Sequence, residues 1–173
     1  ATNEVEEVTE KANSILLVED NEELLQLMTK LLNRDYNVFT AENGKEGITV
    51  LENEDIDLIV SDVMMPEMNG IEFCKYVKGH LEISHIPVIL LTAKNKEEAY
   101  EAGAEAFISK PFNLTVLHAR IRNLLKYKER TARDFKNQLV FEVKDLNYTS
   151  LDEDFIKRAI ECVNNHLADA AFD

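Results

Sequence analysis

The chain is 173 residues long, 45% apolar and 30% charged, a composition typical of a folded protein that is soluble in water. It has neither a signal peptide nor an apolar run of the roughly 20 residues that span a bilayer, so we expect a cytoplasmic protein without membrane contact. The formal net charge of −14 is spread along the sequence and argues against a broad basic surface for DNA. Two widely separated cysteines, Cys74 and Cys162, indicate a reducing compartment.

From residue 14 onward, short apolar segments alternate with longer segments whose apolar residues recur at helical spacing. In chain order, the expected elements are strand 15–18, helix 21–33, strand 36–40, helix 43–52, strand 57–61, helix 70–78, strand 86–91, helix 96–102, strand 106–109 and a helix from residue 114 onward. Five such units predict an α/β fold, a doubly wound five-stranded parallel sheet with helices on both faces. Right-handed crossovers favour the flavodoxin-like strand order 2-1-3-4-5, whose switch point lies between the first and third strands.

The regular alternation ends near residue 130, and this change sets the expected domain boundaries. We expect a flexible leader over residues 1–13 and one compact domain over residues 14–130. Residues 131–173 are expected to form a C-terminal helical extension, a linker with the first helix of a truncated output region. Within it, residues 139–143 alternate as in a short strand or an extended linker.

A second amphipathic helix is expected near the end of the sequence, over residues 151–167. The residues from Ser150 to Glu153 have the pattern of a capping box ahead of it. Its apolar side needs a partner surface, which we expect to be the compact domain or a second copy of the chain, and we favour a homodimer. The apolar residues are Phe155, Ile156, Ala159, Ile160, Val163 and Leu167.

Polar residues stand at the ends of the expected strands, and the carboxyl ends of parallel strands meet at one edge of the sheet. Three converging carboxylates repel one another unless a cation neutralises them, and an all-oxygen set suits Mg²⁺. A hydroxyl and an ammonium opposite that ion suit the oxygens of a phosphoryl group. Asp62 is then the candidate nucleophile, since a carboxylate can form an acyl phosphate. The residues are Glu19, Asp20, Asp62, Thr92, Ala93 and Lys110.

Each of these residues also has an ordinary explanation when it is taken alone. Glu19 or Asp20 could cap the following helix, and Asp62 could be a turn residue. Thr92 could be a simple hydroxyl after a strand, and Lys110 a simple surface lysine. Their joint occurrence at four strand ends is what favours a site.

Four blocks of sequence resemble the signature segments of response regulator receiver domains of two-component signalling. They read ILLVEDNEELL, DLIVSDVMMPEMNGIEFC, IPVILLTAK and GAEAFISKPFN, and the resemblance covers roughly residues 14–127. It implies a phosphoprotein module that takes a phosphoryl group from a histidine kinase onto Asp62 and switches a downstream output. Such a module is not an enzyme, although it assists its own phosphoryl transfer and dephosphorylation.

The same resemblance implies a role for each residue at the strand ends. Those that hold Mg²⁺ are Glu19, Asp20 and Asp62, through their carboxylates, and Met64, through its backbone carbonyl. Those that meet the phosphoryl group are Thr92, the switch hydroxyl, Ala93, through its amide, and Lys110, through its charge. Phe107 takes the place of the family's rotating aromatic residue, with core packing as the alternative, and Lys110–Pro111 is expected to be a cis peptide.

The parent protein is expected to be a transcriptional regulator, possibly fused to its sensor kinase. Residues 149–173 resemble the segment before AraC-type DNA-binding domains of hybrid two-component regulators, so DNA contact belongs to a downstream domain that this sequence lacks. Thr92 and Lys110 are 18 positions apart, about one helical turn less than is usual in the family. The shortfall falls in the expected fourth helix and puts the family's usual dimer mode in question.

Two other functions are compatible with parts of the pattern. An Mg²⁺-dependent phosphatase of the haloacid dehalogenase type also uses acidic residues and an aspartyl phosphate. Its nucleophile usually follows the first strand, with a second Asp two residues later, whereas here that strand ends in Glu19-Asp20-Asn21. A pseudo-receiver that only mediates protein contacts is disfavoured by the complete acid set and by Thr92 and Lys110.

Overall fold

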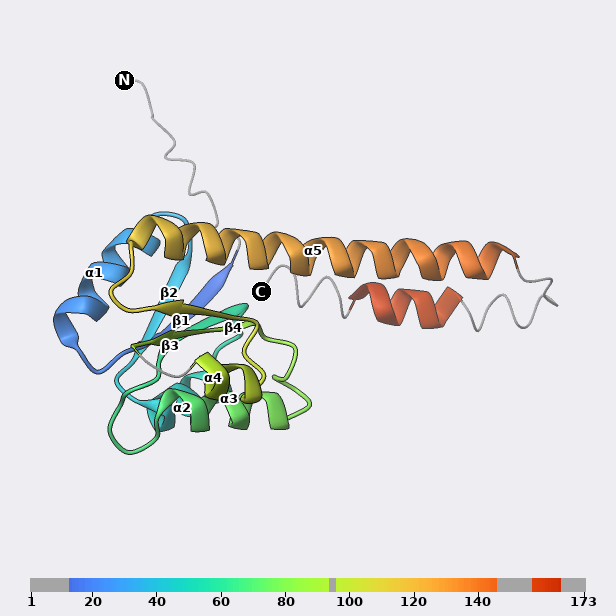
Figure 1. The fold of residues 1–173 in the computed structure, drawn as a ribbon. Coiled ribbons are helices and arrows are strands. Elements are labelled where there is room, and N and C mark those ends of the chain that lie inside the picture. The colour runs from blue at the N-terminus through green and yellow to red at the C-terminus, as the bar shows by residue number, and fades with distance from the viewer. Residues whose placement is uncertain (1–12, 94–95, 146–156, 166–173) are drawn as a thin grey trace, which may run out of the picture.

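The computed structural model describes residues 13–93, 96–145 and 157–165, and its centre is a five-stranded sheet (Figure 1). All neighbouring strands are parallel, in the order β2-β1-β3-β4-β5. The predicted fold class and strand order are therefore confirmed. The strands are β1 (Ser14–Val18), β2 (Asn37–Ala41), β3 (Leu58–Asp62), β4 (Val88–Thr92) and β5 (Ala106–Ser109).

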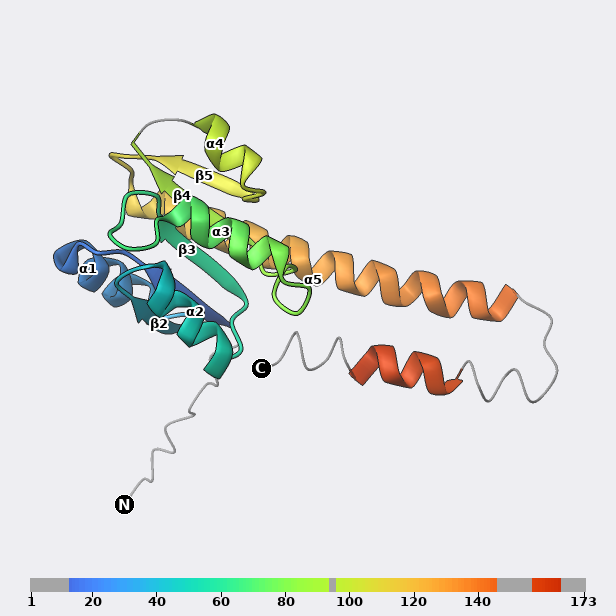
Figure 2. The ribbon, with the colours of Figure 1, turned by 90° about the horizontal axis from the view of Figure 1, so that it is seen from below.

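Helices cover both faces of the sheet, as Figure 2 shows from a second side. Helices α1 and α5 lie on one face, and α2, α3 and α4 lie on the other. Because β1, β3 and β4 are covered on both sides, every one of their residues is buried, which is why they read as continuous apolar runs. The helices are α1 (Glu22–Leu32), α2 (Gly44–Asn53), α3 (Gly70–Gly79), α4 (Lys96–Glu101) and α5 (Leu114–Asp145).

Three helices that follow strands begin at an asparagine. The side-chain oxygens of Asn21, Asn43 and Asn69 accept hydrogen bonds from backbone amides in the first turns of α1, α2 and α3. Each bond satisfies an amide that has no partner inside its helix. These caps fix where the loops after β1 and β3 end; Glu19 and Asp20 lie in the first of these loops, and Asp62 directly precedes the second.

Helix α5 is longer than the sequence suggested and runs without interruption past residue 130 to Asp145. The prediction of a strand or extended linker over residues 139–143 is therefore wrong. The helix contains neither glycine nor proline, and Ala132, Phe135 and Leu139 continue its apolar spacing. Whether residue 130 is a domain boundary stays a prediction.

Part of the second amphipathic helix is described, over residues 157–165, within the expected range of 151–167. In both views it lies beside the part of α5 that projects from the sheet (Figures 1 and 2). Ile160 and Val163 of its apolar stripe are half-buried. The expected capping box and nearly all of the expected leader lie outside the described residues. No helix in the described ranges is long and apolar enough to span a membrane.

Candidate functional site

The carboxyl edge of the sheet brings three carboxylates together. Glu19 and Asp20 directly follow β1, and Asp62 is the last residue of β3, which pairs with β1. One carboxylate oxygen from each of the three lies within 4.8 Å of the others. Glu19 and Asp62 are buried, whereas Asp20 is exposed to solvent. Such an all-oxygen set, open on one side, fits a hard divalent cation such as Mg²⁺.

Glu19 is the most deeply buried of the three carboxylates. It is 1% exposed, and its Oε1 accepts the amide of Asn21 at 3.0 Å. Burial raises the pKa of Glu19 to about 7; the charge of Asp62 adds to the rise, while Lys110 and the Asn21 amide oppose it. A buried carboxylate with a raised pKa is stabilised in its charged form by a bound cation. The residues present therefore fit Mg²⁺.

Lys110, directly after β5, supplies a positive charge at the same edge. Its Nζ lies 2.9 Å from Asp62 Oδ2 and 3.4 Å from Glu19 Oε2. Burial alone would lower the pKa of Lys110, but the hydrogen bond and charge of Asp62, helped by Glu19, raise it overall, so the ammonium stays charged. The Lys110 amide donates to the Thr92 carbonyl at 2.8 Å, which ties the ends of β4 and β5 together. The Lys110–Pro111 peptide is cis, as expected.

The remaining residues of the expected site lie at different depths around Asp62. Thr92, the last residue of β4, is 2% exposed, and Ala93 after it is exposed. Met64 is 74% exposed, and its amide donates to Asp62 Oδ1 at 3.3 Å. Phe107 is not part of the acidic cluster: it is half-buried in β5 and packs into the core beneath α2, α3 and α4.

Gly70, which the sequence analysis treated only as the end of a loop, is a structural support of Asp62. A Cβ atom at this position would lie 2.0 Å from the Asp62 carbonyl oxygen. The Gly70 amide donates to the Val63 carbonyl at 3.0 Å, so the first turn of α3 lies directly against the strand end. Only glycine allows this approach without a backbone shift.

We expect Gly70→Ala to lower the free energy of unfolding by about 1–3 kcal/mol, because the added methyl group overlaps backbone atoms of β3. Denaturant unfolding measures this change. Gly79→Ala, in the same helix, is the matched control, since nothing lies within 4 Å of a Cβ at Gly79. The control should be neutral or slightly stabilising. Equal stability of the two variants would contradict the proposed contact.

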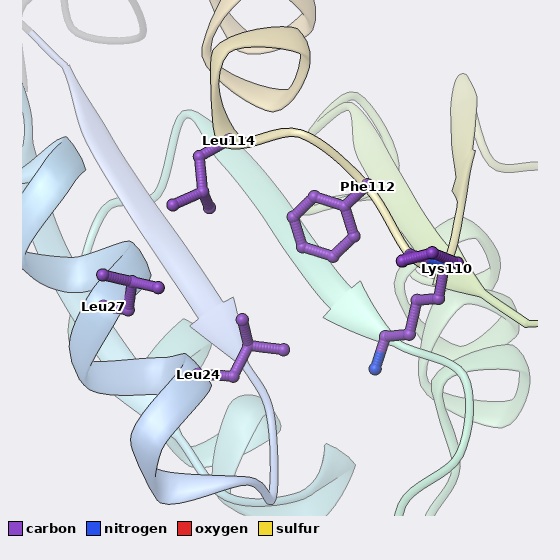
Figure 3. A pocket seen from close by; sticks show the side chains of 6 residues that line it. Leu24, Leu27, Lys110, Phe112 and Leu114 are labelled. Atoms are coloured by element: carbon purple, nitrogen blue, oxygen red, sulfur yellow. The ribbon is translucent and has the colours of Figure 1, made fainter.

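An apolar pocket of about 570 Å³ opens beside the acidic cluster, between α1 and the segment that joins β5 to α5 (Figure 3). Lys110 is part of its lining, so one end of the pocket reaches a residue that contacts Asp62. This pocket was not predicted from the sequence, because it lies between segments that are far apart in the chain. The lining residues are Leu24, Leu27, Lys110, Pro111, Phe112 and Leu114.

Comparison with known proteins identifies the class that this fold and site define. Residues 15–122 match the model of the response regulator receiver domain, and this range is more than half of the chain. The chain therefore belongs to the response regulator receiver domain family, which confirms the resemblance drawn from the sequence. Receiver domains are in general non-enzymatic modules that histidine kinases phosphorylate, and they bind Mg²⁺ in an acidic pocket.

Curated relatives include both kinases and transcriptional regulators. The chain is 40% identical over 171 residues to "Histidine kinase P4" of Formosa agariphila, covering 96% of this chain and 12% of that protein. It is 40% identical over 119 residues to the transcriptional regulatory protein CpxR of Escherichia coli, covering 66% of this chain and 50% of the relative. The chain thus spans half or less of either protein.

Solved structures with the same fold include receiver domains and a response regulator. One comes from a signal transduction histidine kinase of Syntrophus aciditrophicus, with 37% identity, a TM-score of 0.64, and coverage of 66% of this chain and 91% of that chain. Another is the chemotaxis response regulator CheY4 of Vibrio cholerae, with 31% identity, a TM-score of 0.60, and coverage of 64% and 97%. A BeF3-activated DrrB receiver domain has 30% identity, a TM-score of 0.60, and coverage of 66% and 97%.

Proposed function

We propose that this chain is the phosphoryl-accepting receiver of a two-component signalling protein, in which Asp62 takes a phosphoryl group from a phosphohistidine of a histidine kinase in the presence of Mg²⁺. One observation carries the proposal. The Asp62 carboxylate, 5% exposed, lies between the Lys110 ammonium at 2.9 Å and the carboxylates of Glu19 and Asp20. The Asp62 carboxylate, as the nucleophile, therefore lies directly beside a cation site and a fixed positive charge.

The chemistry at this site is a displacement at phosphorus. A carboxylate oxygen of Asp62 forms the new O–P bond while the P–N bond of the phosphohistidine breaks, and the imidazole nitrogen keeps the electron pair and takes up a proton. Mg²⁺ would be held by the backbone carbonyl of Met64 and by the carboxylates of Glu19, Asp20 and Asp62. Once bound, it would offset the negative charge of the phosphoryl oxygens. Lys110 already contacts the Asp62 carboxylate, and its ammonium can form an ion pair with a phosphoryl oxygen once the group is attached.

Two further donors of this edge suit the oxygens of the phosphoryl group once it is attached. In our proposal the Thr92 hydroxyl turns to donate to one of these oxygens, and the amide of Ala93 contacts the same group. Thr92 is buried at the end of β4, next to the strand that carries Asp62.

The apolar pocket beside Lys110 is the surface on which we propose the phosphodonor protein docks. A phosphohistidine must reach Asp62 from the carboxyl edge of the sheet, and this pocket opens there. Leu27 is 52% exposed at its rim, so an apolar side chain of a partner can cover it. Burying such leucines stabilises a complex by roughly 1.5–3 kcal/mol for each side chain.

Leu27→Glu is expected to slow phosphoryl transfer from a phosphorylated histidine kinase domain about tenfold or more, because a charge replaces buried apolar area. Transfer from a small phosphodonor should be unchanged, because Leu27 does not contact Asp62. Leu81→Glu, at a leucine that is 91% exposed in the loop after α3, is the matched control. Equal slowing with both donors, or in both variants, would contradict docking at this pocket.

The parent protein belongs to the same proposal. The match to "Histidine kinase P4" covers 96% of this chain, including residues beyond the receiver. We therefore propose that the chain is a cytoplasmic segment of a hybrid kinase or transcriptional regulator whose DNA-binding domain follows it, with AraC-type character and a dimer as expected from the sequence. In the single chain Ile160 and Val163 are only half-buried in the helix over residues 157–165, beside α5, which leaves apolar area for a second copy to cover.

The direct test uses a small phosphodonor and intact-mass spectrometry, with Mg²⁺ present or removed by a chelator. The proposal predicts one phosphoryl adduct that is lost in hydroxylamine and that forms only with Mg²⁺. A hydrolytic enzyme of the phosphatase type would instead release phosphate from added substrates without a lasting adduct. A pseudo-receiver would form no adduct under either condition.

A further inference from the structure

The loop between β3 and α3, residues 63–69, directly follows Asp62 and carries Met64. The Met64 amide donates to Asp62 Oδ1 at 3.3 Å, and the Met64 carbonyl is the one backbone ligand of the Mg²⁺ site proposed above. A backbone ligand has no side-chain torsion to adjust, so the conformation of the chain alone sets its position. The contacts that hold this loop therefore bear directly on the cation site.

Both ends of the loop are fixed by hydrogen bonds. At its start, Gly70 lies against the end of β3, and its amide donates to the Val63 carbonyl at 3.0 Å. Near its end, the Met68 carbonyl accepts the amide of Gly44, in the first turn of α2, at 3.2 Å. Only residues 64–67 lie between these two points, so the loop has little freedom while both contacts are made.

The missing side chain of Gly44 is what allows the loop to lie so close to α2. Gly44 is buried, and a Cβ atom there would lie 2.6 Å from Met68 Cγ and 2.8 Å from Met68 Sδ. Met68 is half-buried and packs against the core cluster that contains Phe73. The side chain and the carbonyl of Met68 thus both contact α2, and together they join the loop to that helix.

The loop is held against the preference of its own backbone. Glu67 has a φ of 63°, and it is the single non-glycine residue with a positive φ in the part of the chain that the structure describes. Such a conformation is unfavourable for a residue with a side chain and persists only where surrounding contacts impose it. Glu67 itself is exposed, and the nearest such contacts are those of Met68, the next residue, with α2.

Resting on the function proposed above, we propose that Gly44 and Met68 are positioning residues of the cation site. Their contact fixes the loop in the conformation in which the Met64 carbonyl can reach Mg²⁺ beside the Asp62 carboxylate. Neither residue is a ligand, and both act through the loop. Helix α2, which carries none of the proposed ligands, thereby sets the affinity of the site.

The kind of ligand affected gives the size of the expected effect. The three carboxylates stay in place when the loop shifts, because β1 and β3 position them. Loss of a partner that orients a metal ligand typically lowers metal affinity about 10–100-fold. A neutral carbonyl can be replaced by water, so we expect a smaller loss, about three- to tenfold.

The experiment measures the Mg²⁺ affinity of the full chain by calorimetric titration, with circular dichroism to check that each variant is folded. Gly44→Ala should weaken binding about three- to tenfold, because the added methyl group displaces Met68. Met68→Ala should weaken binding to a similar extent, because the side chain that joins the loop to α2 is lost. Met68→Ala adds no atoms, so it decides the question if Gly44→Ala does not fold.

Gly47→Ala, in the next turn of α2, is the matched control. A Cβ atom at Gly47 would lie 2.9 Å from Phe73 Cζ, so this variant disturbs the packing of α2 on α3 without a contact to the loop. It should lose stability in denaturant as Gly44→Ala does, and it should keep the wild-type Mg²⁺ affinity. In the double variant, Gly44→Ala should weaken binding no further than Met68→Ala alone, because the two residues act through one contact.

Unchanged Mg²⁺ affinity in a folded Gly44→Ala or Met68→Ala variant would overturn this inference and leave the proposed function intact. An equal loss of affinity in Gly47→Ala, or losses that add in full in the double variant, would overturn it in the same way. Absence of Mg²⁺ binding by the wild-type chain would contradict the proposed function and this inference together.

Discussion

Asp62→Asn abolishes the phosphoryl adduct completely in our account, because an amide has no carboxylate oxygen to attack phosphorus. The variant should still fold, since Lys110 keeps its second partner, Glu19, at 3.4 Å and a source of repulsion between carboxylates is removed. Intact-mass spectrometry after incubation with a small phosphodonor and Mg²⁺ measures the loss. Circular dichroism checks that the fold is retained.

Asp55→Asn is the matched control for this substitution. Asp55 is exposed and precedes β3, at the opposite end of the strand from Asp62. The control makes the same change in charge and should form the adduct at the wild-type rate. An adduct of wild-type yield in Asp62→Asn would contradict the assignment of the nucleophile.

The second large expected effect is a loss of Mg²⁺ affinity. Asp20→Asn is expected to weaken Mg²⁺ binding on the order of tenfold or more, because it removes one of three carboxylates whose oxygens lie within 4.8 Å of one another. Asp20 is exposed, so the change disturbs little packing, and the metal-free protein should become more stable because one of three mutually repelling charges is removed. Calorimetric titration with Mg²⁺ and denaturant unfolding measure the two effects.

Glu23→Gln, at an exposed carboxylate in the first turn of α1, separates a local effect from one of net charge. This control should leave the Mg²⁺ affinity close to that of the wild type, because long-range charge effects are screened by salt. Equal weakening in the two variants would mean that Asp20 acts only through net charge and is not a ligand.

Because the pKa of Glu19 is raised, both the Mg²⁺ affinity and the stability of the metal-free protein should depend on pH. The metal-free folded protein holds a proton on Glu19 up to about pH 7, while the unfolded chain releases it near the ordinary value of 4.5. Mg²⁺ must displace this proton, so its affinity should fall as the pH drops below about 7. Because the pKa of Glu19 is higher in the folded protein than in the unfolded chain, the contribution of Glu19 to the stability of the metal-free protein decreases as the pH rises from 4.5 through about 7. An Mg²⁺ affinity that stays constant between pH 8 and about pH 5.5 would contradict this account.

The fold could be predicted from the sequence because its signals are local. The apolar runs of β1, β3 and β4 are buried on both faces, and the helices that follow β1 and β3 each have a clear apolar stripe. Parallel pairing then brings the strand ends to one edge. The meeting of Glu19, Asp20 and Asp62 follows from strand order alone.

The features that the sequence did not reveal depend on packing between distant segments. The contact of Gly70 with the Asp62 carbonyl is a matter of how closely α3 approaches β3, and the spacing of residues does not encode that distance. The pocket at Leu27 and the contact between Gly44 and Met68 likewise join separate elements. The extent of α5 was missed because the apolar positions near Leu139 fit a strand and a helix equally well over so short a window.

The central claim is that Asp62 forms the acyl phosphate, and one measurement addresses it directly. The wild-type chain is incubated with a small phosphodonor and Mg²⁺, the acyl phosphate is reduced with borohydride to an alcohol, and the altered residue is located by peptide mass spectrometry. Our account predicts reduction at Asp62 alone, and none when the phosphodonor or Mg²⁺ is left out. Reduction at Glu19, Asp20 or another carboxylate, with Asp62 unaltered, would contradict it.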